Sequence, residues 1–352
     1  MKINSYYTGG VTELKLRGAC LSGTLDANSS LFKLHQLRYL DLSLNNISSS
    51  LPAEFGRLTD LEFLDLHQNR FTGELPSSFS NTTTFLTIVS KEKCPNGYAW
   101  NLPSLTATNL SHNSFDSFQG SLLHNSSVLV HLFLRSNAFE GFFPNIPPTV
   151  KYVDASNNNF TGEMPLSLCN LRKLLVLELS NNSFSGSVPR CLSESITLLN
   201  LRRNNLTSLP DTFSNSSLEL LDVGNNQISG KLPRSLEHCK SLEYVDVESN
   251  QISDTFPFWL ESLPNLEVLV LRSNRFYGPI SSPQHPRPFS KLMMINIAGN
   301  MFGGSLPPNY FVNWSAAIGP RAANARKYKQ NTPMLRFPCL YQTTKIETKC
   351  VL

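Results

Sequence analysis

The side chains best suited to chemistry are seven histidines and seven cysteines, and their spacing matches no catalytic or metal-binding motif. The sequence lacks G-x-S-x-G, a P-loop, H-E-x-x-H and any protein-kinase signature. His112 and His131 fall in neighbouring strand-like segments and could meet, but two histidines without a carboxylate or a third ligand make a poor metal site. The sequence therefore predicts a protein that is not an enzyme and that has no metal site and no cofactor.

None of the cysteines forms a C-x-x-C pair, which disfavours a zinc or redox site. Cys169 and Cys191 lie 22 residues apart, near the ends of two successive copies of a repeat. Stacking of these copies would bring the two side chains close together. A disulfide in an oxidising compartment is the favoured interpretation, and two buried free thiols are the alternative. Cys239 replaces an apolar residue before Leu242, so we expect it in the core.

Ten asparagines begin an N-x-S/T sequon, the acceptor for N-glycosylation. Asparagine and serine are abundant in this chain, so some sequons arise by chance. Several nevertheless lie in loops or beside the asparagine of the repeat, where a glycan would be exposed. We expect most to be used if the chain is exported, although Asn109 falls inside a predicted strand. The ten are Asn28, Asn46, Asn81, Asn109, Asn125, Asn159, Asn181, Asn205, Asn215 and Asn313.

These residues belong to a repeated pattern, L-x-x-L-x-L-x-x-N-x-h-x-G-x-h-P, in which h is apolar. It is clearest from Leu61 to Pro76 and has seven further clear copies. Looser copies begin at Val11, Leu37, Leu105 and Ile196, which makes twelve copies in all. The gap between Leu61 and Leu105 fits one degenerate copy at about residues 85–104, so we expect about 13 repeats.

Each position of the pattern has a physical role. The L-x-L core alternates with period two and predicts a short strand with one buried face. The asparagine follows where the chain turns inward, and its amide can pair backbone groups of its own and the adjacent repeat. The pattern predicts a leucine-rich-repeat solenoid. This is a right-handed, curved superhelix with a parallel sheet on its concave face and loops, 3-10 turns or short helices on its convex face.

The variable strand positions predict a binding surface on the concave face. Strands stacked at ~4.8 Å give a strip roughly 60 Å long, which suits a peptide or protein better than a small metabolite. The aspartate of each strand recurs with the pattern and is expected to be an ordinary solvated residue. Tyrosine and arginine break the pattern and are typical of binding hot spots. The candidate contacts are Tyr152, Arg202, Arg203, Tyr244, Glu248 and Arg272.

Charge and hydropathy bound the remaining possibilities. The net charge is +4, and the C-terminal tail, residues 314–352, carries seven basic residues against one acid, so the rest of the chain sums to −2. We expect this tail to be poorly ordered. The repeat region, residues 11–313, is nearly neutral, so no nucleic-acid surface is predicted. No apolar stretch approaches the roughly 20 residues of a membrane span, and the lead-in, residues 1–10, lacks the apolar core of a signal peptide.

The G-x-h-P extension and several segments resemble the ectodomains of plant receptor-like proteins. These segments are LRYLDLSLNN from Leu37, SLCN from Ser167 followed by Pro189-Arg-Cys191, and LVLRSNRFYGP from Leu269. The resemblance covers residues 9–318. It implies a receptor without a kinase, on the extracellular face of the plasma membrane, that senses ligands in defence or development through partner receptor kinases. Arg202 and Arg203 resemble the paired arginines with which some related kinases hold a peptide carboxylate, although the spacing differs.

Members of that family also carry a signal peptide, a cysteine-bearing cap and a transmembrane helix, so the sequence is expected to be truncated at both ends. Two alternatives to a receptor remain. One is a secreted inhibitor of the polygalacturonase-inhibiting type, which uses the same repeat between paired caps. The other is a non-functional fragment, because an uncapped first repeat would leave Leu14, Leu16 and Leu21 facing water.

Overall fold

The computed structural model describes residues 3–5, 10–61, 63–75, 106–118, 129–214, 217–280 and 288–305. These residues fall into two compact units, one within Met1–Phe160 and one within Thr161–Leu335. The two units have the same architecture, and each is described by itself. The predicted tail at residues 314–352 and the predicted degenerate repeat at residues 85–104 lie outside the described residues.

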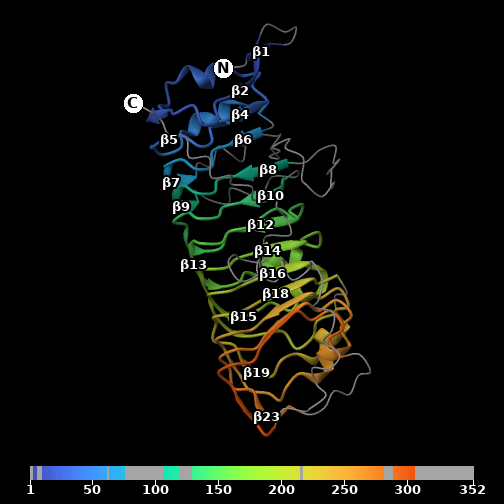
Figure 1. Ribbon diagram of the computed structural model, residues 1–352. Coiled ribbons are helices and arrows are strands. Elements are labelled where there is room, and N and C mark those ends of the chain that lie inside the picture. The colour runs from blue at the N-terminus through green and yellow to red at the C-terminus, as the bar shows by residue number, and fades with distance from the viewer. Residues whose placement is uncertain are drawn as a thin grey trace. The chain divides into compact units, whose positions relative to one another are not determined.

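In the first unit, the L-x-L segments form one main sheet whose neighbouring strands come from successive repeats (Figure 1). The strands from β2 onward are parallel, whereas β1 adds antiparallel to β2. The strands in order are β1 (Ile3–Ser5), β2 (Val11–Lys15), β4 (Tyr39–Asp41), β6 (Phe63–Asp65), β8 (Thr106–Asn109), β10 (Leu129–Phe133) and β12 (Tyr152–Asp154).

The second unit repeats this arrangement with strict register. Leu198, Leu220, Tyr244, Val268 and Met294 are paired in turn along the sheet. Such regular pairing follows from repeats of nearly constant length. The strands in order are β14 (Val176–Glu178), β16 (Leu198–Asn200), β18 (Leu220–Asp222), β20 (Tyr244–Asp246), β22 (Val268–Val270) and β24 (Met294–Asn296).

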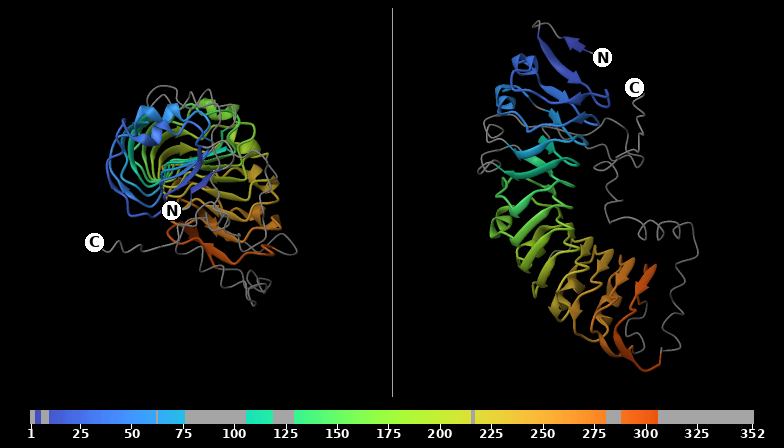
Figure 2. Two further views of the ribbon diagram at one scale, coloured as in Figure 1. Left: turned by 90° about the horizontal axis from the view of Figure 1, so that it is seen from above. Right: turned by 90° about the vertical axis from the view of Figure 1, so that its left-hand side faces the viewer.

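Short elements complete each coil. In the first unit, 3-10 helices η1 (Ser30–Lys33) and η2 (Ala53–Arg57) lie across the coil from strands β2 and β4 (Figure 2). The proline that ends the pattern lies directly before four of the 3-10 helices, because its fixed φ suits the start of a helical turn. In the second unit the helices are η4 (Leu166–Asn170), α1 (Leu192–Ser195), η5 (Arg234–His238) and η6 (Phe258–Ser262).

A second set of strands follows the asparagine of each repeat and pairs in parallel between neighbouring repeats. They form small sheets rather than one continuous sheet. In the first unit they are β3 (Ser22–Gly23), β5 (Asn46–Ile47), β7 (Thr72–Leu75), β9 (Ser114–Phe118) and β11 (Glu140–Phe142). Those that follow are β13 (Asn159–Glu163), β15 (Ser183–Ser187), β17 (Asn205–Ser208), β19 (Ser229–Gly230), β21 (Gln251–Ile252), β23 (Tyr277–Pro279) and β25 (Met301–Gly303).

The core consists of identical positions stacked on one another. The middle residues of the main strands are buried, as at Leu64, Leu177 and Leu221. The apolar residue that follows the asparagine is often phenylalanine, and in the first unit Phe115 stacks on Phe139 with ring centroids 6.2 Å apart. Each repeat thereby buries an apolar edge that it could not bury alone.

The asparagines of the pattern form the predicted hydrogen-bond ladder. Asn250 is typical: its Oδ1 accepts from the Ile228 amide of the preceding repeat at 2.9 Å. Its Nδ2 donates to the Val223 carbonyl of that repeat at 3.0 Å and to the Val247 carbonyl of its own repeat at 3.1 Å. The ladder joins adjacent turns where backbone groups would otherwise be buried without partners.

In the main sheet of the first unit, β6 and β8 are direct neighbours: Asp65 pairs with Asn109, and Asn113 Nδ2 donates to the Leu66 carbonyl at 3.0 Å. The described residues supply six parallel main strands in each unit. One expectation is corrected: the edge of the first repeat is less open than expected, since β1 pairs with β2, although Leu21 remains 36% exposed.

Candidate ligand-binding surface

The first and third residues of each main strand lie on the face of the sheet away from the core, which we call the open face. The recurring aspartates on this face are not solvated as expected, because Asp154, Asp222 and Asp246 are at most 4% exposed. Asp154 shows why: its Oδ1 accepts from the Ser156 amide at 3.0 Å and from Ser156 Oγ at 2.6 Å. The aspartate thus holds the turn that leaves the strand.

In the second unit, the open face carries an ion cluster that spans three strands. Arg202, just beyond β16, places Nη1 2.8 Å from Asp246 Oδ2 and 3.5 Å from Asp222 Oδ1. Its Nη2 also pairs with Glu248. The Tyr244 hydroxyl donates to Asp246 Oδ2 at 3.2 Å. We call Arg202, Asp222, Tyr244, Asp246 and Glu248 the Arg202 cluster.

A glycine makes this cluster possible. Gly224 occupies the position of the repeat at which Ser156 and Ser180 stand in other copies. A Cβ at Gly224 would lie 2.5 Å from Arg202 Nη1. The missing side chain lets the guanidinium pass over β18 to the carboxylates of the next repeat. This glycine was not singled out from the sequence, where the only signal is a glycine in place of the usual small polar residue.

Burial sets the protonation of the cluster. Burial, together with the nearby Asp246, raises the pKa of Asp222 to about 7. Burial likewise raises the pKa of Asp246, against the hydrogen bond from the Glu248 amide and the charge of Arg202. Burial alone would lower the pKa of Arg202, but Asp222 and Asp246 raise it above its usual value. The guanidinium stays charged, and Asp222 is the carboxylate of the cluster whose pKa lies near neutrality.

The open face of the first unit carries stacked aromatic side chains beside charged ones. Tyr39 stacks on Phe63 with ring centroids 3.7 Å apart, and Lys15 Nζ lies 4.6 Å from the centroid of Tyr39. Further along, the ring centroids of His131 and Tyr152 lie 4.5 Å apart. Tyr39 and Phe63 were not singled out from the sequence, because each looks like an ordinary β-former until its neighbours in the next repeat are known.

The two histidines considered as metal ligands have surroundings that favour the neutral form. His131 is 4% exposed, its Nδ1 has no hydrogen-bond partner, and burial lowers its pKa to about 4. Burial also lowers the pKa of His112, with a further contribution from Arg135. Within the described part of the chain, no three histidine, cysteine, aspartate or glutamate side chains gather as a metal site would require.

The six predicted contact residues differ in how much surface they offer. Tyr152, in the first unit, and Tyr244, in the second, are largely buried. Arg202 and Glu248 are half-buried and paired with each other, so they do not present free charges. The most accessible of the six are Arg203 and Arg272.

The sequons within the described residues are mostly accessible. Asn46, Asn159 and Asn205 occupy one position of the repeat, at the start of β5, β13 and β17. In each, alternation turns the middle residue of the sequon into the core and leaves the asparagine exposed. Asn28 and Asn181 are also exposed and Asn109 is half-buried. The remaining four, Asn81, Asn125, Asn215 and Asn313, lie outside the described residues.

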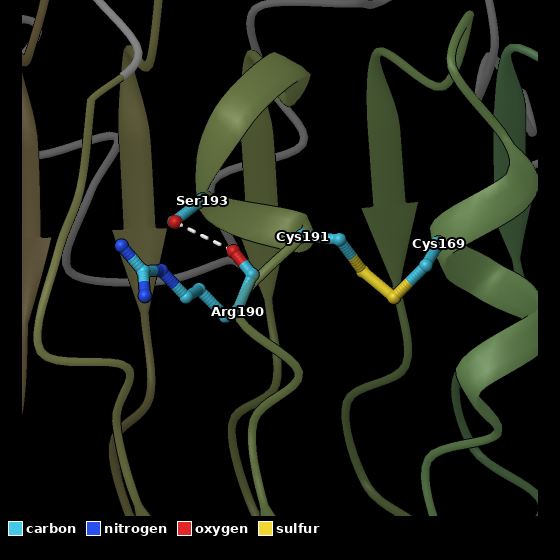
Figure 3. The surroundings of a disulfide bond; sticks show 4 residues. All are labelled: Cys169, Arg190, Cys191 and Ser193. Carbon is cyan, nitrogen blue, oxygen red and sulfur yellow. Dashed lines mark hydrogen bonds between the residues drawn. A yellow bond between two sulfur atoms is a disulfide. The ribbon is translucent and has the colours of Figure 1, made fainter.

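Cys169 and Cys191 form the predicted disulfide, with their Cα atoms 5.3 Å apart (Figure 3). Cys169 belongs to η4 and Cys191 directly precedes α1, so the bond links the helical segments of two successive repeats. Next to it, Ser193 Oγ donates to the Arg190 carbonyl at 2.7 Å (Figure 3). Cys239 is a buried free thiol, as predicted, and burial raises its pKa to about 11.

The repeat architecture agrees with the matches to known families and relatives. Models described as "Leucine rich repeat" match residues 21–71 and 194–252, and 149–171 and 173–194. Receptor-like protein 54 of Arabidopsis thaliana is 45% identical over 260 residues, which cover 70% of this chain and 32% of that protein. Receptor like protein 23 of the same plant is 44% identical over 293 residues, 81% of this chain and 33% of that protein.

The chain is a plant leucine-rich-repeat protein of the receptor-like type. It spans about a third of the length of these curated relatives. Among the helices that the structure describes, none has the length and apolar character needed to cross a membrane.

Solved structures with similar folds include plant receptor ectodomains. A TDR receptor superimposes with a TM-score of 0.71 at 27% identity. The match covers 84% of this receptor-like chain and 48% of the TDR receptor chain. The Arabidopsis receptor kinase HAESA, in complex with the peptide hormone IDA and the co-receptor SERK1, gives a TM-score of 0.61 at 28% identity. That match covers 86% of this chain and 56% of the HAESA chain.

Proposed function

We propose that this chain is part of an extracellular recognition scaffold that binds a peptide or protein on the open face of its main sheet. It would signal through partner receptor kinases at the plasma membrane. The observation that carries the proposal is the open face itself, where side chains from successive repeats stand in register at strand spacing. The spacing of residues along an extended peptide is of the same order as the spacing of strands in the sheet. Such a face can therefore contact one ligand through many repeats.

Two further findings support this function. The relatives are receptor-like proteins, and the HAESA ectodomain of the same fold was solved with a peptide hormone and a co-receptor. The disulfide between Cys169 and Cys191 is suited to an oxidising extracellular compartment. The exposed sequons are suited to the same compartment.

Just beyond the ends of β16 and β22, beside the open face of the second unit, we assign the first contacts to Arg203 and Arg272. Both are exposed cations, and neither belongs to the Arg202 cluster. Arginine in such a position can bind a carboxylate of a ligand through two parallel hydrogen bonds. Arg202 has a structural role and offers no free charge to a ligand, since its guanidinium is paired with three carboxylates.

The proposal is tested with the secreted full chain and a displayed library of random 12-residue peptides. Selected peptides are then titrated by calorimetry against wild type, Arg272→Ala and the matched surface variant Arg275→Ala. Arg275 is also exposed, but it lies beyond the asparagine of its repeat and so away from the main strands. We expect Arg272→Ala to weaken binding at least tenfold and Arg275→Ala to leave it unchanged. Equal affinities for all three proteins would refute recognition by the open face.

A further inference from the structure

The Arg202 cluster concentrates three carboxylates around one guanidinium on neighbouring repeats of the second unit. Asp222 and Asp246 are directly paired in the register of β18 and β20. Their side chains therefore stand side by side at strand spacing. Asp222 is 1% exposed and Asp246 is 4% exposed, so water screens neither charge effectively.

The guanidinium of Arg202 neutralises the negative charges of Asp222 and Asp246 unequally. Arg202 Nη1 is 2.8 Å from Asp246 but 3.5 Å from Asp222. Asp246 also accepts from the Tyr244 hydroxyl and, at 2.8 Å, from the Glu248 amide. Asp222 Oδ1 accepts from the Gly224 amide at 3.0 Å. Asp222 is thus the carboxylate least able to remain ionised.

Among the described residues, the strands on either side of the cluster carry carboxylate and apolar side chains. On β14, Glu178 is itself a buried carboxylate, and it accepts from Asn200 Nδ2 at 2.7 Å and from the Ser180 amide at 3.1 Å. On β22, the corresponding strand residues are the apolar Val268 and Val270. Asn225 Nδ2 donates to Glu248 at 3.3 Å and brings no charge. Arg203 and Arg272 are exposed to solvent.

We propose that the Arg202 cluster is a proton-operated clasp between the repeats of β16, β18 and β20, closed when Asp222 carries a proton and loosened when Asp222 is ionised. In the closed state, Arg202 is shared by Asp246 and Glu248, and no carboxylate charge faces Asp246 across the strand pair. When Asp222 releases its proton, two buried carboxylates repel each other and only one guanidinium lies between them. The clasp is independent of any ligand, and its test needs none.

The direction of the pH response follows from proton linkage. Asp222 in the folded state has a pKa raised to about 7 by burial and by Asp246, whereas an unfolded aspartate titrates near pH ~4. Between these values the folded state holds a proton that the unfolded chain has released. Acid therefore favours the folded state. Stability is fully present below about pH 4 and is lost as the pH rises through about 7.

The test is hydrogen exchange of the full chain, measured by mass spectrometry between pH 5 and pH 8 and corrected for intrinsic exchange rates. Amides that bridge the three strands report on the clasp, such as Leu201 N–H donating to the Asp222 carbonyl and Val223 N–H donating to the Asp246 carbonyl. We expect their opening constant in wild type to rise by up to about tenfold per pH unit as far as pH 7. Asp222→Asn removes the titrating group at constant shape and should abolish this rise.

Asp154→Asn is the matched control, because Asp154 holds the same position of the repeat, is equally buried and accepts hydrogen bonds from Ser156, but lies in the first unit, away from the Arg202 cluster. It should leave the pH response of the second unit unchanged. Gly224→Ala is a second, independent variant: its Cβ displaces the guanidinium, so the rise should continue to higher pH. The proposal is overturned if Asp222→Asn keeps the wild-type rise, or if Asp154→Asn removes it as fully as Asp222→Asn does.

Discussion

Replacing Asn204 by alanine tests the hydrogen-bond ladder on which the fold depends. Asn204 is 6% exposed, and its Oδ1 accepts from the Phe184 amide of the preceding repeat at 2.9 Å. Its Nδ2 donates to the Leu179 and Leu201 carbonyls at 3.0 Å each. It also donates to the Arg202 carbonyl at 3.4 Å, so the side chain joins two successive turns of the second unit through one acceptor and three donor contacts.

The loss of stability depends on which backbone groups bonded to Asn204 keep another hydrogen-bond partner in the variant. The Leu179 carbonyl still accepts from Asn182 Nδ2 at 3.1 Å, and the Leu201 carbonyl still accepts from Asn226 Nδ2 at 3.0 Å. The Phe184 amide is the group that loses its acceptor. Stranding one buried donor costs about 1–3 kcal/mol, and each of the two shorter carbonyl contacts that are lost adds about 0.5–1 kcal/mol. We expect Asn204→Ala to lower the free energy of unfolding by about 2–5 kcal/mol.

The neighbouring Asn205 provides the control, since it is the same residue type, one position along, and exposed. Asn205→Ala in enzymatically deglycosylated protein should change the free energy of unfolding by less than about 0.5 kcal/mol. Urea unfolding followed by far-UV circular dichroism measures both variants, and hydrogen exchange at Phe184 locates the effect. If Asn204→Ala is no more destabilising than Asn205→Ala, the ladder does not hold the repeats together as described.

Three further outcomes are expected. Cys169→Ser should lower stability by about 3 kcal/mol, the chain-entropy value for a loop of 22 residues, and wild type in reducing agent should show the same loss; no difference in urea midpoint would contradict this. Asn159→Gln and Asn205→Gln should each remove one glycan from secreted protein by mass spectrometry, and unchanged masses would show those sequons to be unused. The Cys239 thiol, buried and with a pKa raised to about 11, should react with iodoacetamide at pH 8 at least about a hundredfold more slowly in native than in denatured protein, and equal rates would contradict its burial.

Much of the fold follows from local pattern, because each repeat uses the same few interactions. The twelve L-x-L segments all become main strands, and their asparagines form the ladder. The disulfide between Cys169 and Cys191 was predictable for the same reason, since a repeat of near-constant length brings equivalent positions together. Cys239 occupies an apolar position of the pattern and is buried accordingly.

The sequence was a poorer guide wherever two repeats had to be compared. The thirteenth repeat was inferred from a gap in spacing, and it stays a prediction because residues 85–104 lie outside the described part of the chain. The strand aspartates were expected in solvent, because a charged residue in a sequence, taken without its neighbours in space, is normally assigned to the surface. Their burial depends on hydrogen bonds to the turn that follows, as at Asp154 and Ser156.

What the sequence by itself determined is the periodic part of this protein: the strands, the ladder, the core positions and the family. These features can be predicted from the sequence because each repeat makes the same hydrogen bonds and buries the same apolar edge. Only the tertiary structure decided the character of the open face. Arg202 is a half-buried ion-pair partner rather than a free ligand contact, because Gly224, one repeat away, leaves room for its guanidinium to reach Asp246. That relation joins Arg202 to Gly224, 22 positions along the chain, and to Asp246, 44 positions along it, and no single repeat contains it.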